Sequence, residues 1–206
     1  MKRPPKPRCI SCEHFDCYRE KDCFDLKDTH QSLYQAKGIA ELHRAASAIE
    51  ARHYCQEPRL SELILFAREM GFRKLGIAFC IGMTEEAKIL GKILSREFEV
   101  ISVCCKVSGI PKHLYNLEQI RPENPVEVMC NPAGQATVLN DAGTDLNIIC
   151  GLCVGHDAIF TLTSKAPVTT FIVKDRVLGH NPAAALYVQY LRRSFLPQSD
   201  RPQEDS

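Results

Sequence analysis

The sequence of 206 residues lacks the marks of several common classes of protein. No stretch approaches the ~18 consecutive apolar residues that a membrane-spanning helix needs. The basic start of the chain, residues 1–8, is not followed by the apolar segment of a secretory signal, so we expect a cytoplasmic protein. The 26 basic and 25 acidic residues leave a net charge of +1, which gives no bias toward nucleic acid or an anionic membrane.

Two familiar catalytic signatures are also missing. There is no G-x-S-x-G motif, so the strained turn that presents the serine of an α/β-hydrolase is not predicted. Gly76 and Gly82 do not have the G-x-G-x-x-G spacing of a dinucleotide-binding turn. The sequence therefore does not support a Ser-His-Asp hydrolase, and it carries no dinucleotide-binding fingerprint.

Cysteine is abundant, with 11 residues in a chain that has no tryptophan. Without a secretion signal, we expect these cysteines in a reducing compartment, where thiols bind metals or take part in redox reactions instead of forming structural disulfides. The cysteine content therefore favours a metal-binding or redox protein.

The densest group of cysteines lies near the N-terminus, with the spacing C-x2-C-x4-C-x5-C. Four thiols this close together can enclose a tetrahedral zinc ion or an iron–sulfur cluster, and the spacing does not distinguish the two. The residues between them are polar and cannot fold alone, so a metal would supply the order. Four unpaired structural cysteines in a charged segment are the poorer alternative. We interpret residues 1–30 as a metal-binding segment with the ligands Cys9, Cys12, Cys17 and Cys23.

The remainder of the chain alternates between strands and helices after two initial helices. The helices are predicted at residues 34–54 and 60–70, and the strands at 74–79, 99–104, 146–149 and 168–173. The third strand reads as apolar along its length, which is typical of a parallel sheet covered on both faces. We therefore predict a small doubly wound, Rossmann-like parallel sheet of about four strands in an α/β domain at residues 31–197, followed by a disordered polar tail at 198–206.

Sulfur follows three of the four predicted strands, at the edge where parallel sheets carry their chemistry. Successive side chains of a strand point to opposite faces, so only one of Cys104 and Cys105 should reach this edge, and we favour Cys105. The alternative is a set of buried thiols scattered through the sheet. We expect a second metal site with the ligands Cys80, Cys105, Cys130, Cys150 and Cys153. Around these ligands we expect side chains that donate hydrogen bonds or carry protons, and the candidates are His156, His180, Cys104, Asp157 and Lys174.

Two similar phrases place a candidate ligand before a helix. Cys130 precedes Asn131-Pro132 and His180 precedes Asn181-Pro182, in which Asn suits the N-cap and Pro the first turn. The second phrase begins the last predicted helix, residues 182–193, which we expect to bury Ala185, Leu186 and Tyr190. The positive end of a helix dipole stabilises a thiolate or a bound anion. Residues 106–129, rich in proline and without periodicity, are either a lid near this edge or a surface insertion.

Three phrases resemble a known group of proteins: Cys130-Asn-Pro-Ala-Gly-Gln-Ala, Gly151-Leu-Cys-Val-Gly-His-Asp and Lys174-Asp-Arg-Val-Leu-Gly-His-Asn-Pro. They look like an uncharacterised, cysteine-rich family of predicted metal-binding proteins from anaerobic prokaryotes, known as a domain of unknown function. The resemblance covers most of the chain. It implies metal binding and names no reaction.

Three classes of function remain open. The first is an iron–sulfur or zinc protein that performs redox or sulfur chemistry on a small molecule at the sheet edge. The second is a non-enzymatic metal or redox sensor that acts on a protein partner. The third is an anion- or nucleotide-binding module that uses the Asn-Pro helix starts. We rank them in that order.

Overall fold

The computed structural model describes residues 7–196, which form two compact units divided after Pro58. The expected polar tail at 198–206 lies outside the described residues. The division by contacts falls after Pro58, whereas composition placed a division after residue 30, so two helices are grouped with the cysteine-rich segment. Each unit is described by itself.

The N-terminal unit is helical. Two 3-10 helices, Cys9–Ser11 and Asp16–Arg19, carry the cysteine-rich part, and the α-helices α1 (Lys27–Leu33) and α2 (Lys37–His53) follow. Helix α2 confirms the helix predicted at 34–54. It buries Ala45 and Ile49, while Ile39 near its start is 45% exposed.

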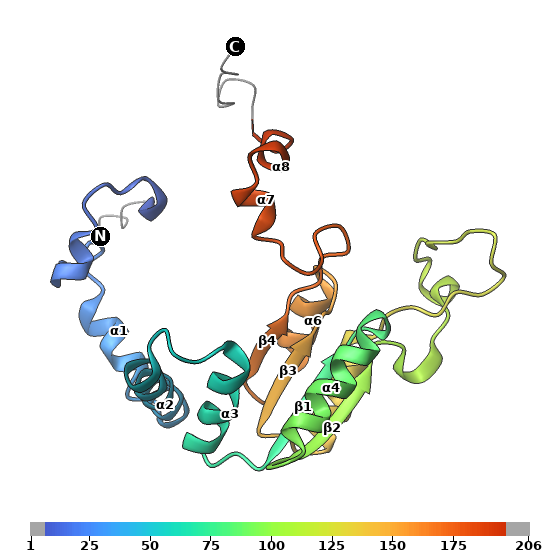
Figure 1. The fold of residues 1–206 in the computed structure, drawn as a ribbon, viewed down its shortest axis with the longest axis horizontal. Helices are drawn as coiled ribbons and strands as arrows, with labels where there is room; N and C mark the ends of the chain where they lie inside the picture. The colour runs from blue at the N-terminus through green and yellow to red at the C-terminus, as the bar shows by residue number, and fades with distance from the viewer. Residues whose placement is uncertain (1–6, 197–206) are drawn as a thin grey trace. The chain divides into compact units, whose positions relative to one another are not determined.

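The C-terminal unit contains a four-stranded, all-parallel sheet in the order β2-β1-β3-β4 (Figure 1). This confirms the predicted fold class, and all four strands begin at the predicted residue and end within one residue of the prediction. Short 3-10 helices occupy Ile81–Met83, Val107–Gly109 and Lys112–Tyr115. The regular elements are α3 (Arg59–Glu69), β1 (Lys74–Phe79), α4 (Thr84–Leu94), β2 (Glu99–Cys104), α5 (Pro132–Asp141), β3 (Leu146–Cys150), α6 (His156–Thr163), β4 (Val168–Ile172), α7 (Ala184–Tyr187) and α8 (Gln189–Arg193).

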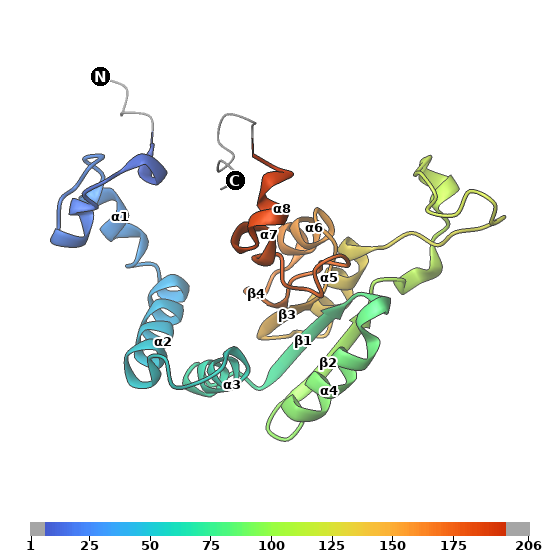
Figure 2. The same cartoon turned by 45° about the horizontal axis from the view of Figure 1, so that its top comes forward.

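The order of the strands reverses between β1 and β3. The chain moves outward from β1 through α4 to β2, then crosses back through α5 to β3 and continues through α6 to β4. Right-handed crossovers in opposite directions place α4 on one face of the sheet and the paired helices α5 and α6 on the other (Figure 1, Figure 2). In such sheets, the crevice beyond the carboxyl ends of the strands at this reversal is the usual binding position.

The core lies on both faces of the central strands. All five residues of β3 are buried, as expected for a strand covered on both sides. One of them is polar: Asn147 is fully buried, accepts a hydrogen bond from Thr144 Oγ1 at 2.7 Å and donates to Ser164 Oγ at 2.8 Å. Gly76 is its partner on β1, and the missing side chain there leaves room for the Asn147 amide.

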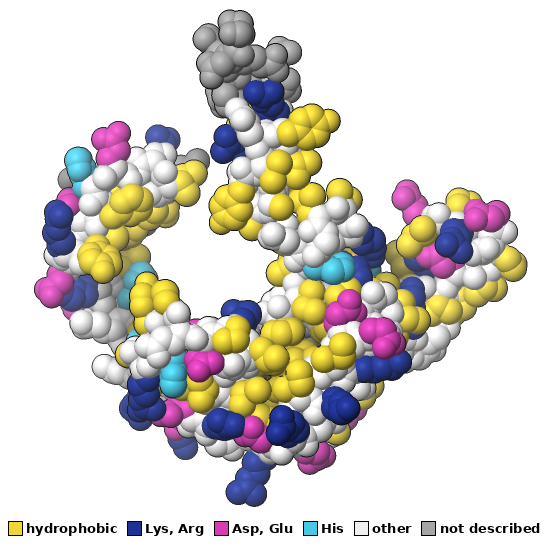
Figure 3. Space-filling view, in the orientation of Figure 1, with side chains coloured by type: hydrophobic (Ala, Val, Ile, Leu, Met, Phe, Trp, Pro, Cys, Tyr) yellow, Lys and Arg dark blue, Asp and Glu magenta, His cyan; other side chains and the backbone are white. Residues whose placement is uncertain are grey.

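The last helix differs from its prediction. A single helix over 182–193 that buries Leu186 and Tyr190 was expected, but the chain forms the short helices α7 and α8, broken at Val188, whose backbone is extended. Leu186 and Tyr190 are 66% and 79% exposed, and Figure 3 shows apolar side chains at the surface of this segment. Short helices draw their stability from packing an apolar face, so without a buried face a long helix is not maintained.

No helix within residues 7–196 combines the length and the apolar character that crossing a membrane requires.

Candidate functional site: a thiol cluster at the carboxyl edge of the sheet

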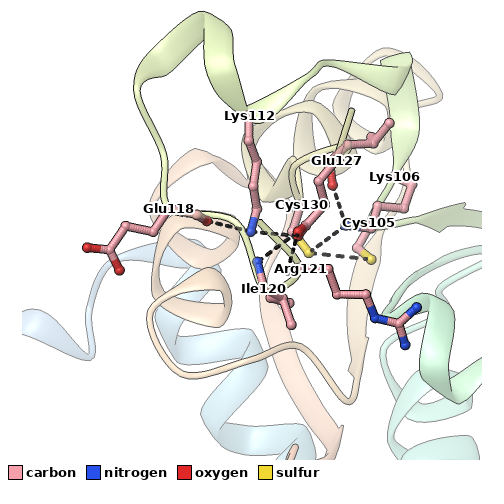
Figure 4. A network of polar contacts seen from close by, with 9 residues as sticks. Cys105, Lys106, Lys112, Glu118, Ile120, Arg121, Glu127 and Cys130 are labelled. Carbon is pink, nitrogen blue, oxygen red and sulfur yellow. Dashed lines mark hydrogen bonds and ion pairs between the residues drawn. The ribbon is translucent and has the colours of Figure 1, made fainter. Parts of the chain in front are cut away.

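Three cysteines from different parts of the chain meet where β1 and β2 end. Cys80 directly follows β1 and Cys105 directly follows β2, and the Cys105 amide donates to the Phe79 carbonyl at 2.8 Å. The Cys105 and Cys130 sulfurs lie 3.9 Å apart (Figure 4). The sulfurs of Cys80 and Cys105 are also in hydrogen-bonding contact, and this contact lowers the pKa of Cys80. We call Cys80, Cys105 and Cys130 the edge thiols; Cys105 is the middle one.

Backbone and side-chain contacts fix Cys130 beside Cys105. The Asn131 amide donates to the Cys105 carbonyl at 2.8 Å, so the two cysteines sit on adjoining stretches of backbone. Asn131 caps α5 as predicted, because its Oδ1 accepts from the Gly134 amide at 2.8 Å. One turn on, the buried Gln135 donates through Nε2 to the carbonyls of Phe79 and Val103, at 3.1 and 2.7 Å. Helix α5 is thereby tied to the ends of β1 and β2.

Donors surround the edge thiols. The Ile81 amide donates to the Cys105 sulfur at 3.3 Å, and Lys106 Nζ lies 3.6 Å from the Cys130 sulfur. The amide of Gly82 contributes to the lowered pKa of Cys80, and so does Lys174, whose charge faces that thiol. These contacts all favour the thiolate form of the sulfurs that receive them.

The three edge thiols titrate as a group. The hydrogen bond from Cys105, followed by the positive charges of Lys106 and His156, lowers the pKa of Cys130 to about 5. The hydrogen bond from Cys105, with smaller contributions from Gly82 and Lys174, likewise lowers the pKa of Cys80 to about 5. The pKa of Cys105 moves up, because its proton is shared with the neighbouring sulfurs of Cys130 and Cys80 and because the thiol is buried. In the metal-free protein, Cys105 is therefore the proton donor between two thiolates.

A pH profile of alkylation tests this assignment. The thiolate is the reactive form and exists above its pKa, so iodoacetamide should modify Cys130 of the metal-free protein at a nearly constant rate from pH 8 to 6 and more slowly below about pH 5. A free thiol with a pKa of ~8.5 would slow by roughly 80-fold between pH 8 and 6. Cys105→Ala removes the donor and should move the Cys130 profile to higher pH. A wild-type profile that follows free cysteine would contradict the assignment.

The other predicted site residues fall into two groups. Cys153 lies near the edge thiols: Arg176 donates to its sulfur at 3.0 Å. The pKa of Arg176 is raised first by this bond and further by the charges of Cys80 and Cys130, which places all three sulfurs near one guanidinium. Cys150 is fully buried at the end of β3, where loss of solvation raises its pKa to about 11.

The side chains predicted to surround the metal ligands also fall into two groups, those at the edge and those away from it. The charge of His156 lowers the pKa of Cys130 and that of Lys174 lowers the pKa of Cys80, so both side chains lie at this edge. His180 turns back on its own loop, where its Nδ1 accepts from the Asp175 amide at 3.1 Å. Its position ahead of a regular helix was predicted wrongly, since Asn181 does not cap α7. Asp157 accepts from the Ala158 amide at 2.8 Å, within α6, and Cys104 is partly buried against the core.

The sequence did not single out Lys106 or Arg176 as site residues. The signal available for each was its position, since Lys106 directly follows Cys105 and Arg176 stands in the charged run after β4. Charged residues at the carboxyl ends of two strands are brought to the same edge as the cysteines. Their pairing with sulfur depends on loop conformation, which spacing alone does not predict.

Residues 106–129 begin and end at the edge thiols. Lys106 Nζ donates to the Val128 carbonyl at 2.6 Å, and this contact closes the base of the loop. Within it, Lys112 and Glu127 form an ion pair at 2.7 Å, and both side chains are largely buried. Glu127 also accepts from the amides of Ile120 and Arg121 (Figure 4). The loop is thus a folded excursion with its own polar centre, and its base lies at the predicted edge.

The four N-terminal thiols are exposed and free. Cys12 accepts a hydrogen bond from the Phe15 amide at 3.3 Å. The pKa of Lys21 is raised, first by the hydrogen bond of this lysine to Asp16 and further by the charges of Cys23 and Cys12. Within the described residues, neither these thiols nor the edge thiols form a group of three or more His, Cys, Asp or Glu side chains that could hold a metal ion as they stand.

The fold and the edge thiols define a class of small parallel α/β protein with a cysteine-lined carboxyl edge. Residues 18–171 match the family described as Protein of unknown function (DUF1847). The uncharacterized protein MJ0455 of Methanocaldococcus jannaschii is 50% identical over 192 residues, which cover 92% of this chain and 98% of that protein. No solved structure matches the chain. The chain belongs to the DUF1847 family, which confirms the resemblance to a family of unknown function.

Proposed function

We propose that this protein binds a thiophilic metal, as zinc or an iron–sulfur cluster, through Cys80, Cys105 and Cys130, and that it does so in the reducing cytoplasm. The observation that carries the proposal is the sulfur-to-sulfur contact of 3.9 Å between Cys105 and Cys130, with Cys80 in contact with the same middle thiol.

The spacing of the sulfurs suits a tetrahedral metal. Bonds of ~2.3 Å at tetrahedral angles put two ligand sulfurs ~3.8 Å apart. The Cys105–Cys130 separation of 3.9 Å matches one edge of that tetrahedron. Because Cys105 contacts both of the other sulfurs, Cys80 and Cys130 would complete the metal site by moving closer to each other beside it.

The surroundings of the sulfurs support the same conclusion. Metal ligation requires thiolates, and Cys80 and Cys130 already have a lowered pKa, so mainly the Cys105 proton would have to be released. Backbone amides and cations around ligating sulfurs tune their charge and orientation. Lys106 and Arg176 lie near these sulfurs and would offset the negative charge of three thiolates.

A bound zinc ion would supply a Lewis acid, and an iron–sulfur cluster would supply an electron carrier. This chain's own residues hold and orient the sulfurs and keep positive charge at the edge. Lys174 and Arg176 would attract an anionic small molecule to this edge, which is where a substrate would bind if the protein is an enzyme. Anaerobic purification followed by metal and sulfide analysis and an absorption spectrum tests the proposal; the absence of any bound metal would contradict it.

The anion-binding alternative has less support. The N-terminus of α5 is already satisfied by the Asn131 side chain, and in α6 the Asp157 carboxylate accepts from the Ala158 amide. The second Asn-Pro phrase leads only to the four-residue helix α7. Neither predicted helix start therefore offers a preformed anion site.

The N-terminal thiols form a separate part of the proposal. The Phe15 amide directed at the Cys12 sulfur is the kind of donor that ligating sulfurs accept. Because the N-terminal unit is compact by itself, replacing Cys9, Cys12, Cys17 and Cys23 by serine is expected to remove one metal centre without unfolding the α/β unit. Metal analysis and circular dichroism of this variant measure both effects. Unchanged metal content would exclude an N-terminal centre.

A further inference from the structure

We infer that Cys105 and Cys130 also form a redox-active dithiol that reduces low-molecular-weight disulfides and is itself converted to a Cys105–Cys130 disulfide. The inference goes beyond metal binding, because the reaction needs no metal. It rests on the relative positions and accessibility of the two thiols.

The backbone already holds the two cysteines at bonding range. Their sulfurs lie 3.9 Å apart, and the hydrogen bond from the Asn131 amide to the Cys105 carbonyl keeps the adjoining backbones together. The sulfur–sulfur bond of a disulfide is about 2 Å long, and it can join cysteines that lie on neighbouring stretches of backbone. The remaining approach of about 2 Å is within the range of side-chain rotation.

The two thiols differ in their access to a reactant. Cys105 is 2% exposed, whereas Cys130 is only partly buried and has the Lys106 ammonium beside its sulfur, at 3.6 Å. Cys130 is therefore the sulfur that meets a disulfide from solution. Cys105 lies behind it and is placed to complete the reaction.

The reaction proceeds in two exchanges. The Cys130 thiolate attacks one sulfur of a small disulfide, RSSR, and forms a mixed disulfide as the first RS⁻ leaves. Cys105 then loses its proton and attacks the Cys130 sulfur, and the second RS⁻ leaves. Both leaving thiolates take up protons, so the balance is two protein thiols and RSSR giving one protein disulfide and two RSH. The protein loses two electrons and the small disulfide gains them.

The neighbouring cysteines are less well placed for this role. Cys150 is fully buried, and the sulfur of Cys153 is engaged by Arg176. Cys104 precedes Cys105 on the chain and points to the other face of the strand. Cys80 contacts Cys105 and is the competing partner, which the experiment must distinguish.

Oxidised glutathione, added to the metal-free full-length chain with the exposed cysteines Cys9, Cys12, Cys17, Cys23 and Cys55 replaced by serine, provides the test. The expected result is the loss of two thiols and a mass lower by two hydrogens, with the new bond mapped to Cys105 and Cys130. Cys105→Ser should stop at a stable glutathione adduct on Cys130, and Cys130→Ser should form neither product. Cys104→Ser, one residue away, should behave as the parent protein.

Several results would overturn the inference. They are a disulfide that maps to Cys80 and Cys105, a Cys104→Ser variant that loses the reaction, or a parent protein that stays fully reduced. Circular dichroism shows whether each variant is folded, so a loss of reaction through unfolding is recognised. Metal content is measured separately: metal without disulfide formation contradicts only the dithiol, and disulfide formation without metal contradicts only the metal site.

Discussion

Replacement of Cys80, Cys105 and Cys130 together by serine is expected to remove one complete metal centre from anaerobically purified protein. Serine keeps the approximate size of the side chain and removes the thiolate that zinc or iron requires. Metal per chain and, for an iron–sulfur cluster, acid-labile sulfide measure the loss. The N-terminal centre should stay, since it lies in a different compact unit. Cys105→Ser alone should remove most of the edge metal, because this sulfur contacts both of the others.

Two cysteines outside the cluster serve as controls for this loss. Cys104→Ser changes the residue next to Cys105, and Cys55→Ser changes an exposed thiol in the N-terminal unit. Both variants should keep wild-type metal content. If the triple variant also keeps it, or if Cys104→Ser loses as much metal as Cys105→Ser, the edge thiols do not hold the metal.

Gly76→Ala is expected to lower the free energy of unfolding by about 3 kcal/mol. An added Cβ would lie 2.1 Å from Asn147 Oδ1 and 2.9 Å from a Leu139 methyl group. Asn147 cannot easily yield, because it is fully buried and held by Thr144 and Ser164 on either side. Urea unfolding followed by circular dichroism measures the change.

Gly91→Ala is the matched control for this substitution. Gly91 lies in α4, and its added Cβ would meet only the Ile77 Cδ1 atom at an ordinary 3.9 Å. Alanine is a better helix former than glycine by ~1 kcal/mol, so this variant should be as stable as the parent or slightly more so. Equal stability of both variants would show that the close fit at Gly76 does not limit the fold.

The sheet was predictable from the sequence because its strands are buried and separated by helices. A strand such as β1 must be nearly continuous in apolar residues, and this pattern survives in the sequence with few interruptions. Asn147 was the exception within β3, and only the structure shows Thr144, Ser164 and Gly76 arranged to accept it. The end of the chain was predicted from the Asn-Pro signal alone. That signal sufficed at Asn131, where the helix packs on the sheet, and failed at Asn181, where the helical residues stay exposed.

The candidate site was predictable to the extent that it follows from topology. Strand ends bring Cys80 and Cys105 to the same edge. Strand alternation allowed only one of Cys104 and Cys105 to reach it, and Cys105 was favoured because it lies nearer the strand end. The long loop at residues 106–129 brings Cys130 back to the same edge, as the position of Cys130 just before α5 indicated. The pairing of Arg176 with Cys153 depends on the path of the chain after β4, and the sequence carries no periodic signal for it.

The sheet has one further property that concerns the behaviour of the protein at high concentration. Strand β4 is the last in the order of the sheet, so within residues 7–196 its outer side has no neighbouring strand. Arg59, at the start of α3, donates through Nε to the Thr170 carbonyl at 2.9 Å and through a second nitrogen to the Thr169 hydroxyl at 3.0 Å. An open strand invites the addition of a strand from another molecule, and a charged side chain held against it opposes such growth. Arg59 thus holds a charged side chain against the β4 edge, where it opposes the pairing of this strand with another molecule.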